Sequence, residues 1–125
     1  MTAKKVLEPG MPVRHSQSGQ PIMVTLDLLG RRWTLRILWT LRNGERMTSR
    51  RLQSICEITS PNVLTSRLRE LRGAGVVALE EKGGYVLTEQ GQQLLMALGP
   101  LAEWSEQWAR NVGRADLACY TRKNA

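Results

Sequence analysis

The polar side chains between Ser60 and Gly73 have the types and spacing best suited to chemistry with a partner molecule. At 100° per residue, a helix over this stretch places Asn62, Ser66 and Arg69 on one face and three leucines on another. Amide, hydroxyl and guanidinium groups read base edges in the DNA major groove, where Asn pairs with adenine and Arg with guanine. An ordinary solvated helix face is the alternative reading of the same residues.

The limits of this helix follow from the local sequence. Proline disfavours the helical conformation in the residue before it and suits the first helical position, so Ser60 is the expected N-cap and Pro61 the first helical residue. Gly73 or Gly75 is expected to end the helix. The apolar seam that packs on a core is formed by Leu64, Leu68 and Leu71. A surface helix without a partner usually carries Glu and Lys pairs four residues apart, and this one has few.

The net charge of +7 is concentrated around this helix. Between residues 31 and 72 the chain has ten Arg and three Glu, whereas eight basic and eight acidic residues balance outside that window. The guanidinium group is a planar fork that suits phosphate and guanine. A polyanion is therefore the expected partner, because a charge that served only solubility would be spread more evenly.

Another helix is expected to begin after Thr48, a suitable N-cap, with Met47 and Leu52 placed as a hydrophobic staple. Arg50 and Arg51 then fall in its first turn, where cations oppose the helix dipole at a cost of roughly 0.3–1 kcal/mol each. A phosphate bound at that helix end would reverse the sign of the effect. The pair is predicted to hold a backbone phosphate, with a tolerated surface charge as the alternative. The inward side chains of this helix are predicted to be Leu52, Ile55 and Cys56.

The remaining pattern places these residues in a mainly α fold with a small β-hairpin. The expected elements, in chain order, are helices over 21–29 and 33–42, the helix after Thr48, the Ser60 helix, strands over 76–79 and 85–87, and a last helix over 88–112. Residues 80–84 form a tight turn, and Gly99 with Pro100 is expected to kink the last helix. Helix, turn, helix and hairpin is the order of a winged helix. Residues 1–19 are predicted to be a flexible arm and residues 113–125 a tail without a clear pattern.

The tryptophans admit two interpretations. Trp33, with Ile37, Leu38 and Leu41, is predicted to form the buried stripe of the second helix, and Trp39 falls beside that stripe. Core packing is the commoner role of aromatic residues at this spacing, although the two rings could also line a ligand pocket.

Composition excludes several classes of protein. The chain of 125 residues is expected to form one domain, and its 42% hydrophobic and 23% charged residues are those of a globular protein. Neither a run of about 20 apolar residues nor the apolar core of a signal peptide is present, so a cytoplasmic location is expected. Cys56 and Cys119 match no metal-ligand spacing, His15 is the only histidine, and no catalytic constellation occurs. An enzyme, a cofactor and a bound metal are therefore not expected.

Four segments together resemble the HxlR-type transcriptional regulators, which are relatives of the MarR group. They are GRRWTLRIL (residues 30–38), SPNVLTSRLRELRGAGVV (residues 60–77), the start of the last helix at Leu87, Thr88, Glu89 and Gly91, and LAEW (residues 101–104). The resemblance covers roughly residues 20 to 110 in a single order. It implies a bacterial or archaeal winged-helix protein that binds an operator as a dimer, with the first and last helices forming the dimer.

Three positions depart from the family pattern. Family members commonly carry a sensing Cys before the proline that opens the first helix, and this chain has Gln20 before Pro21. The turn of the hairpin is short and offers one cation, Lys82, beside Glu80 and Glu81, which leaves minor-groove contact by this wing open. The family often has a Phe near the start of the third helix, and this chain has none. The sequence identifies no effector, operator or direction of regulation.

The combined prediction is a homodimer whose 20–112 domain places two Ser60–Gly73 helices in successive major grooves of double-stranded DNA, about 34 Å apart. The residues predicted to bind DNA are Arg46, Arg50, Arg51, Ser60, Asn62, Val63, Thr65, Ser66, Arg67, Arg69 and Lys82. For Arg67 an ion pair within the chain is the alternative. The residues predicted to form the dimer interface are Ile22, Leu26, Leu94, Leu98, Leu101, Trp104 and Trp108. Two other functions remain open: an apolar, Trp-lined dimer pocket for a drug or metabolite, and a winged helix used only for protein contacts.

Overall fold

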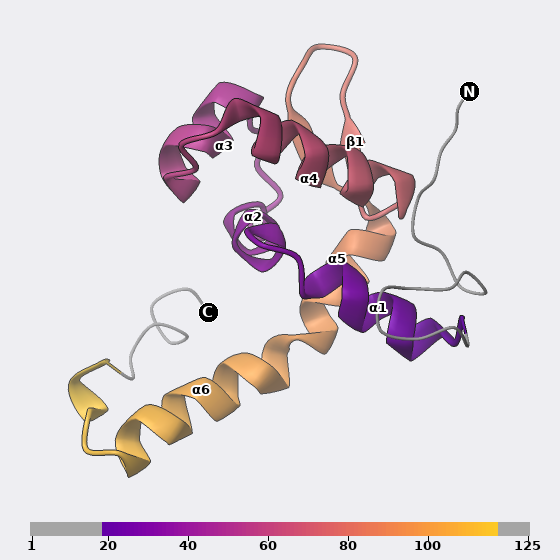
Figure 1. Cartoon of the computed structure of the whole chain (residues 1–125). Helices are drawn as coiled ribbons and strands as arrows, with labels where there is room; N and C mark the ends of the chain where they lie inside the picture. The colour runs from indigo at the N-terminus through magenta and orange to yellow at the C-terminus, as the bar shows by residue number, and fades with distance from the viewer. Residues whose placement is uncertain (1–18, 118–125) are drawn as a thin grey trace. The chain divides into compact units, whose positions relative to one another are not determined.

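The computed structural model describes residues 19–117 as a mainly helical chain with one two-stranded hairpin, which confirms the predicted fold class (Figure 1). Its elements are α1 (Pro21–Leu29), α2 (Thr34–Thr40), α3 (Ser49–Cys56), α4 (Pro61–Gly73), β1 (Val77–Leu79), β2 (Tyr85–Leu87), α5 (Glu89–Ala97), α6 (Gly99–Asn111) and the 3-10 turn η1 (Ala115–Leu117). The predicted arm, His15, Cys119 and the end of the predicted tail lie outside the described residues, apart from Gly19 at the end of the arm.

The chain divides after Gln92 into two compact units, and each is described by itself. In the first unit α2 packs on α1 and α3, and α4 packs on α3 and β1. The side chains that fill this core are almost fully buried and come from every helix of the bundle: Leu28, Ile37, Leu38, Leu41, Leu52, Cys56, Leu64, Leu68 and Leu71. Buried aliphatic surface of this extent is the main favourable contribution to the stability of the unit.

Side-chain caps fix the first residues of the helix-turn-helix. The Thr48 hydroxyl accepts a hydrogen bond from the backbone N–H of Arg51 at 3.1 Å, and the Ser60 hydroxyl accepts one from Val63 at 3.3 Å. Both hydroxyls satisfy donors that lack a partner within the helix, so α3 and α4 begin where their sequences predict. The left-handed conformation of Gly75, with φ of 82°, then turns the chain from the end of α4 toward β1.

The hairpin is antiparallel, with Val77 opposite Leu87 and Leu79 opposite Tyr85. Gly83 and Gly84 close it with φ values of 91° and 93°, a conformation that residues with a Cβ rarely adopt. Met47 joins the edge of this sheet, because its N–H donates to the Tyr85 carbonyl oxygen at 3.0 Å. The segment before α3 is thereby fixed to the hairpin beside its turn.

Two side chains and the extent of the last helix differ from the sequence predictions. Trp33 precedes α2 in a left-handed conformation, with φ of 77°, and is only half-buried, because Thr34 takes the inward position. Ile55 is 43% exposed, since Leu52 and Cys56 define the inward strip of the two-turn helix α3 and Ile55 falls 100° from Cys56. The predicted kinked last helix is two helices, α5 and α6, which meet at Leu98 because the Pro100 ring cannot continue the hydrogen-bond ladder.

The second unit presents its apolar residues to solvent. Helix α6 has no buried residue, and its exposed large side chains are Leu101, Trp104 and Trp108. The indole rings of Trp104 and Trp108 stack with centroids 5.6 Å apart and planes 12° apart. Between residues 19 and 117, no helix has the length and apolar character needed to cross a membrane.

Candidate nucleic-acid interface

Helix α4 has one buried face and one open face. Leu64, Leu68 and Leu71 are at most 2% exposed and hold the helix on the core of the first unit. On the open side Asn62, Thr65 and Arg69 are exposed, while Val63 and Ser66 are half-buried. The structure therefore leaves most of the predicted base-reading groups accessible to a partner.

The first turn of α3 carries two exposed cations, Arg50 and Arg51, and no acidic residue. A guanidinium nitrogen of Arg51 lies 3.9 Å from a carboxylate oxygen of Glu45, and both side chains are 58% exposed. An ion pair this long and this exposed contributes little, about 0–1 kcal/mol, to stability. The turn keeps its positive character and can accept an anion.

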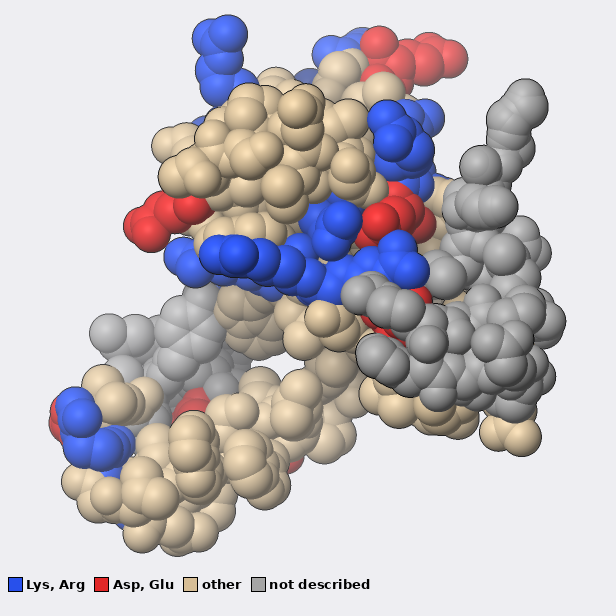
Figure 2. All heavy atoms as spheres, viewed as in Figure 1, with Lys and Arg blue, Asp and Glu red and all other residues tan. Residues whose placement is uncertain are grey.

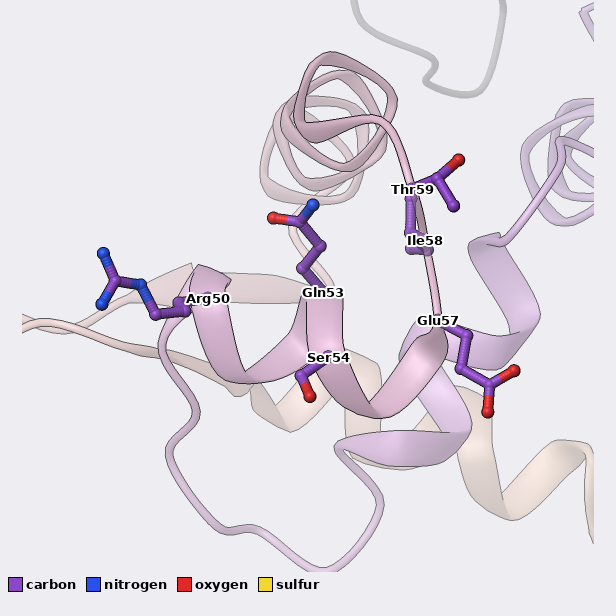
Figure 3. Close-up of a pocket in the computed structure, with 6 residues that line it drawn as sticks. All are labelled: Arg50, Gln53, Ser54, Glu57, Ile58 and Thr59. Atoms are coloured by element: carbon purple, nitrogen blue, oxygen red, sulfur yellow. The ribbon is translucent and has the colours of Figure 1, made fainter.

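A shallow hollow of about 440 Å³ lies where α3 meets the link to α4 (Figure 3). Arg50 and Glu57 project from opposite ends of α3, and Gln53 extends between them from the middle of the helix (Figure 3). The other lining residues are Ser54, Ile58 and Thr59. The left-handed conformation of Glu57, with φ of 58°, makes the turn between the two helices. Gln53 is half-buried in α3 and is not among the residues predicted from the sequence to bind DNA.

The turn of the wing has one cation of its own and a second one lying against it. Glu80, Glu81 and Lys82 are exposed at the tip, as their charge predicts. Arg46 is exposed beside the hairpin, and its side chain lies so close to Gly84 that a Cβ there would overlap it. The cation predicted at Arg46 is therefore positioned by contact with the wing.

A chain of ion pairs joins the end of α1 to α4. The guanidinium of Arg31 lies 2.8 Å from an oxygen of Asp27 and 2.9 Å from an oxygen of Glu70, and Arg67 lies 3.3 Å from the other Glu70 oxygen. Burial alone would lower the pKa of Arg31, but hydrogen bonds and charges from the two carboxylates raise it above its ordinary value. The three ion pairs connect the end of α1 to α4, and Arg67 adopts the intramolecular pairing that was the alternative to a DNA contact.

Two further arginines lie on the first unit near the start of α2. Arg32 and Arg36 are exposed, and their guanidinium carbons lie 5.2 Å and 5.9 Å from the centre of the Trp33 ring. Figure 2 shows basic side chains gathered in a row on the face in view. Neither arginine is among the residues that the sequence predicts to bind DNA. Only the excess of Arg between residues 31 and 72 signals them.

Metal and thiol chemistry have no evident site in the described part of the chain. Between residues 19 and 117, no group of three or more His, Cys, Asp or Glu side chains is placed to hold a metal ion. Cys56 is completely buried, with its sulfur 3.4 Å from the hydroxyl oxygen of Thr40, as expected for a packed thiol.

A capped helix-turn-helix, a hairpin wing and a cluster of exposed arginines are the features of a winged helix-turn-helix transcriptional regulator. Residues 28–112 match the HxlR-like helix-turn-helix family. The chain belongs to this family. The family and the relatives that it resembles are transcriptional regulators and not enzymes.

Two curated relatives come from Bacillus subtilis (strain 168). The HTH-type transcriptional regulator YvaP is 32% identical over 89 residues, which cover 66% of this chain and 82% of YvaP. The HTH-type transcriptional regulator YybR is 30% identical over 112 residues, which cover 85% of this chain and 84% of YybR. These matches span the helix-turn-helix and most of each relative's length.

Two solved structures share the fold. The quinone-bound YodB of B. subtilis superposes with a TM-score of 0.64 and 27% identity, covering 69% of this chain and 94% of YodB. A possible HxlR family transcriptional factor from Thermoplasma volcanium GSS1 gives a TM-score of 0.60 and 29% identity, covering 69% of this chain and 82% of that one.

Proposed function

We propose that the chain is a sequence-specific DNA-binding regulator that acts as a homodimer on a pseudo-palindromic operator. The observation that carries the proposal is the open face of α4, where Asn62, Thr65 and Arg69 are exposed while three leucines hold the helix on the core. A rigid helix with short polar groups on its outer face fits the major groove. The location expected from the sequence, the cytoplasm, agrees with such a partner.

Base reading and backbone contact fall to different parts of the surface. Base edges and the groove wall are assigned to α4, through Asn62, Val63, Thr65, Ser66 and Arg69. Contact with the DNA backbone is assigned to the first turn of α3, to the turn of the wing with the arginine beside it, and to the N-cap of α4. The residues are Arg50, Arg51, Lys82, Arg46 and Ser60. Arg67 is assigned to holding Glu70, and with it α4, because its ion pair directs it toward that carboxylate.

The partner of the apolar residues is proposed to be a second copy of the chain. In α1 Ile22 and Leu26 are 58% and 56% exposed, and in α6 Leu101, Trp104 and Trp108 are each more than half exposed. Leu94 and Leu98 are half-buried and complete the predicted set. Large aromatic residues at an interface remove extensive apolar surface from water and dominate binding energy. A dimer would present two α4 helices to half-sites about 34 Å apart.

The salt dependence of DNA binding tests the proposal. If each subunit neutralises about four phosphates, the logarithm of the binding constant falls against the logarithm of salt concentration with a slope of about −7 or steeper. Fluorescence anisotropy with a duplex pool, at salt concentrations from low to physiological, measures that slope. A slope near −1 would remove the electrostatic basis of the proposal.

A ligand-binding role is the second candidate, and one observation favours it. Trp104 and Trp108 stack on the exposed apolar side of α6, so a dimer formed there would have aromatic rings beside its seam. The relative YodB is described as quinone-bound, so a small molecule could also act on this chain. Quenching of Trp fluorescence by candidate aromatic compounds, without DNA, is the expected sign of such a function. Unchanged fluorescence across a panel of compounds would count against it.

A further inference from the structure

The cavity beside Trp33 joins the start of α2 to the start of α4. Arg32 and Trp33 contribute from just before α2, while Ser60 and Val63 contribute from the N-cap and first turn of α4. Its volume of about 210 Å³ lies below the roughly 300–1,000 Å³ of pockets that enclose drug-sized ligands. The cavity is therefore sized for a small group, and no carboxylate lines it.

Arg32 lines this cavity, and Arg36 lies near the ring of Trp33, which also lines it. In residues 19–117 the structure gives neither Arg32 nor Arg36 an ion pair, whereas the neighbouring Arg31 pairs with Asp27 and Glu70. Both guanidinium groups lie near the same Trp33 ring, where like charges repel. An anion between or beside them would relieve that repulsion.

Both guanidinium groups lie over the Trp33 ring in the free chain. Stacking on an aromatic face restricts the flexible Arg side chain, and a restricted donor loses less entropy when it binds. The unusual left-handed backbone at Trp33, with φ of 77°, directs this ring to its place before α2. A conformation of this kind in a non-glycine residue is strained and persists where the surroundings enforce it.

We propose that this cavity and its arginine pair form a binding site for one oxyanion, the phosphodiester group of a DNA strand that borders the groove entered by α4. The assignment rests on the proposed DNA-binding function and extends it from α3 and α4 to the start of α2. The cavity adjoins the first turn of α4 through Ser60 and Val63, so a backbone flanking the major groove passes this point. Charge complementarity identifies the occupant, because the lining offers a guanidinium and hydroxyl groups and no acid.

The test compares wild-type protein with the Arg32→Gln, Arg36→Gln double variant in anisotropy titrations over a range of salt. Losing one phosphate contact in each subunit should make the slope of log K against log salt shallower by about 1.8 per dimer. Selected and random duplexes should lose affinity alike, because a phosphate contact carries no sequence information.

Two further variants serve as controls. The double variant Arg32→Lys, Arg36→Lys should restore most of the slope, since the charge remains. Arg114→Gln, an exposed arginine of the second unit, is the matched control and should leave the slope unchanged.

The outcomes separate this assignment from the function on which it rests. If the double variant keeps the wild-type salt slope while Arg51→Gln makes that slope shallower, the site at the start of α2 is overturned. The proposed DNA-binding function then remains intact. Wild-type protein without salt-dependent DNA binding overturns both. Inorganic phosphate alone could change the Trp fluorescence of the wild type but not that of the double variant. If the salt slope of DNA binding is then the same for both proteins, the site binds a free anion, and its assignment to DNA is overturned.

Discussion

Helices α4 and α6 each contain 13 residues and expose opposite kinds of surface. Helix α4 buries its three inward leucines in its own unit and leaves Asn62 and Arg69 open. Helix α6 buries no residue and leaves Trp104 and Trp108 more than half exposed. The contrast indicates two kinds of partner, because an open polar face fits a polar, charged molecule and an open aromatic face fits another apolar surface.

The difference also predicts that the open face of α4 sets the specificity for DNA sequence, while the apolar face of α6 sets the affinity of one subunit for another. Short polar groups on a well-packed helix are held in fixed positions, which base reading requires. Large indole rings instead remove apolar area from water, a contribution that depends little on direction. Substitutions in the two helices should therefore affect different measurements.

The largest effect is expected from the aromatic pair of α6. The double variant Trp104→Ala, Trp108→Ala removes two of the proposed interface residues. If each truncation costs about 2 kcal/mol, as for a hot-spot residue, the dimer should be weaker by about a thousandfold. Sedimentation equilibrium measures the dimer dissociation constant. Leu79→Ala, which removes an exposed leucine of the hairpin, is the control and should leave the dimer intact. A double variant as dimeric as wild type would contradict the assignment of α6.

Truncating a buried leucine of α4 should lower the stability of the fold and should not act through the association of subunits. Leu68→Ala creates a cavity in the core and is expected to lower the free energy of unfolding by about 2–5 kcal/mol. Thr65→Ala, on the open face of the same helix, should change it by less than about 0.5 kcal/mol. Urea unfolding followed by circular dichroism compares the two. Equal losses of stability would show that the two faces of α4 are not distinct.

Base reading by α4 should be separable from backbone contact by α3. Asn62→Ala is expected to remove about 1–3 kcal/mol of preference at one base pair of each half-site. Arg51→Ala should weaken all sequences alike and make the salt slope shallower by about 0.9 per subunit. Competition binding with singly substituted duplexes measures both effects. The same profile from the two variants would contradict this division.

The smallest effect is expected at the start of α4. Ser60→Ala removes the hydroxyl that accepts the Val63 N–H and should lower the free energy of unfolding by about 1 kcal/mol. Ser66→Ala in the middle of the helix provides the control, since Ser66 is not a cap. Thermal unfolding of both variants tests whether the cap fixes the reading helix, and identical melting temperatures would argue against it.

Local sequence patterns were sufficient to predict most of the helices and strands of the fold. The caps at Thr48 and Ser60, the buried seam of α4 and the glycine turn of the hairpin follow from interactions within a few residues, and all are as expected from the sequence. The break at Leu98 shows the limit of such patterns, because a proline indicates a disturbance of the helix without deciding between a kink and a break.

Contacts between distant residues could not be predicted in the same way. Arg31 and Glu70 are far apart in the sequence, and only the packed first unit brings their charges within 2.9 Å. Trp33 fits a helical stripe by spacing, but its left-handed backbone places it before the helix and beside two arginines. The residues predicted to bind DNA therefore lie on α3, on α4 and in or beside the wing, and none of them lies at the start of α2.

Selection of bound fragments from random-sequence DNA tests the central claim most directly. The open face of α4 and a dimeric assembly predict an enriched motif with two inverted half-sites, centred about 10–10.5 base pairs or a multiple of that spacing apart. The motif should lose information at one position of each half-site when Asn62→Ala replaces the wild type. Recovery of fragments with no common motif, from protein that binds DNA, would contradict the reading of sequence by α4.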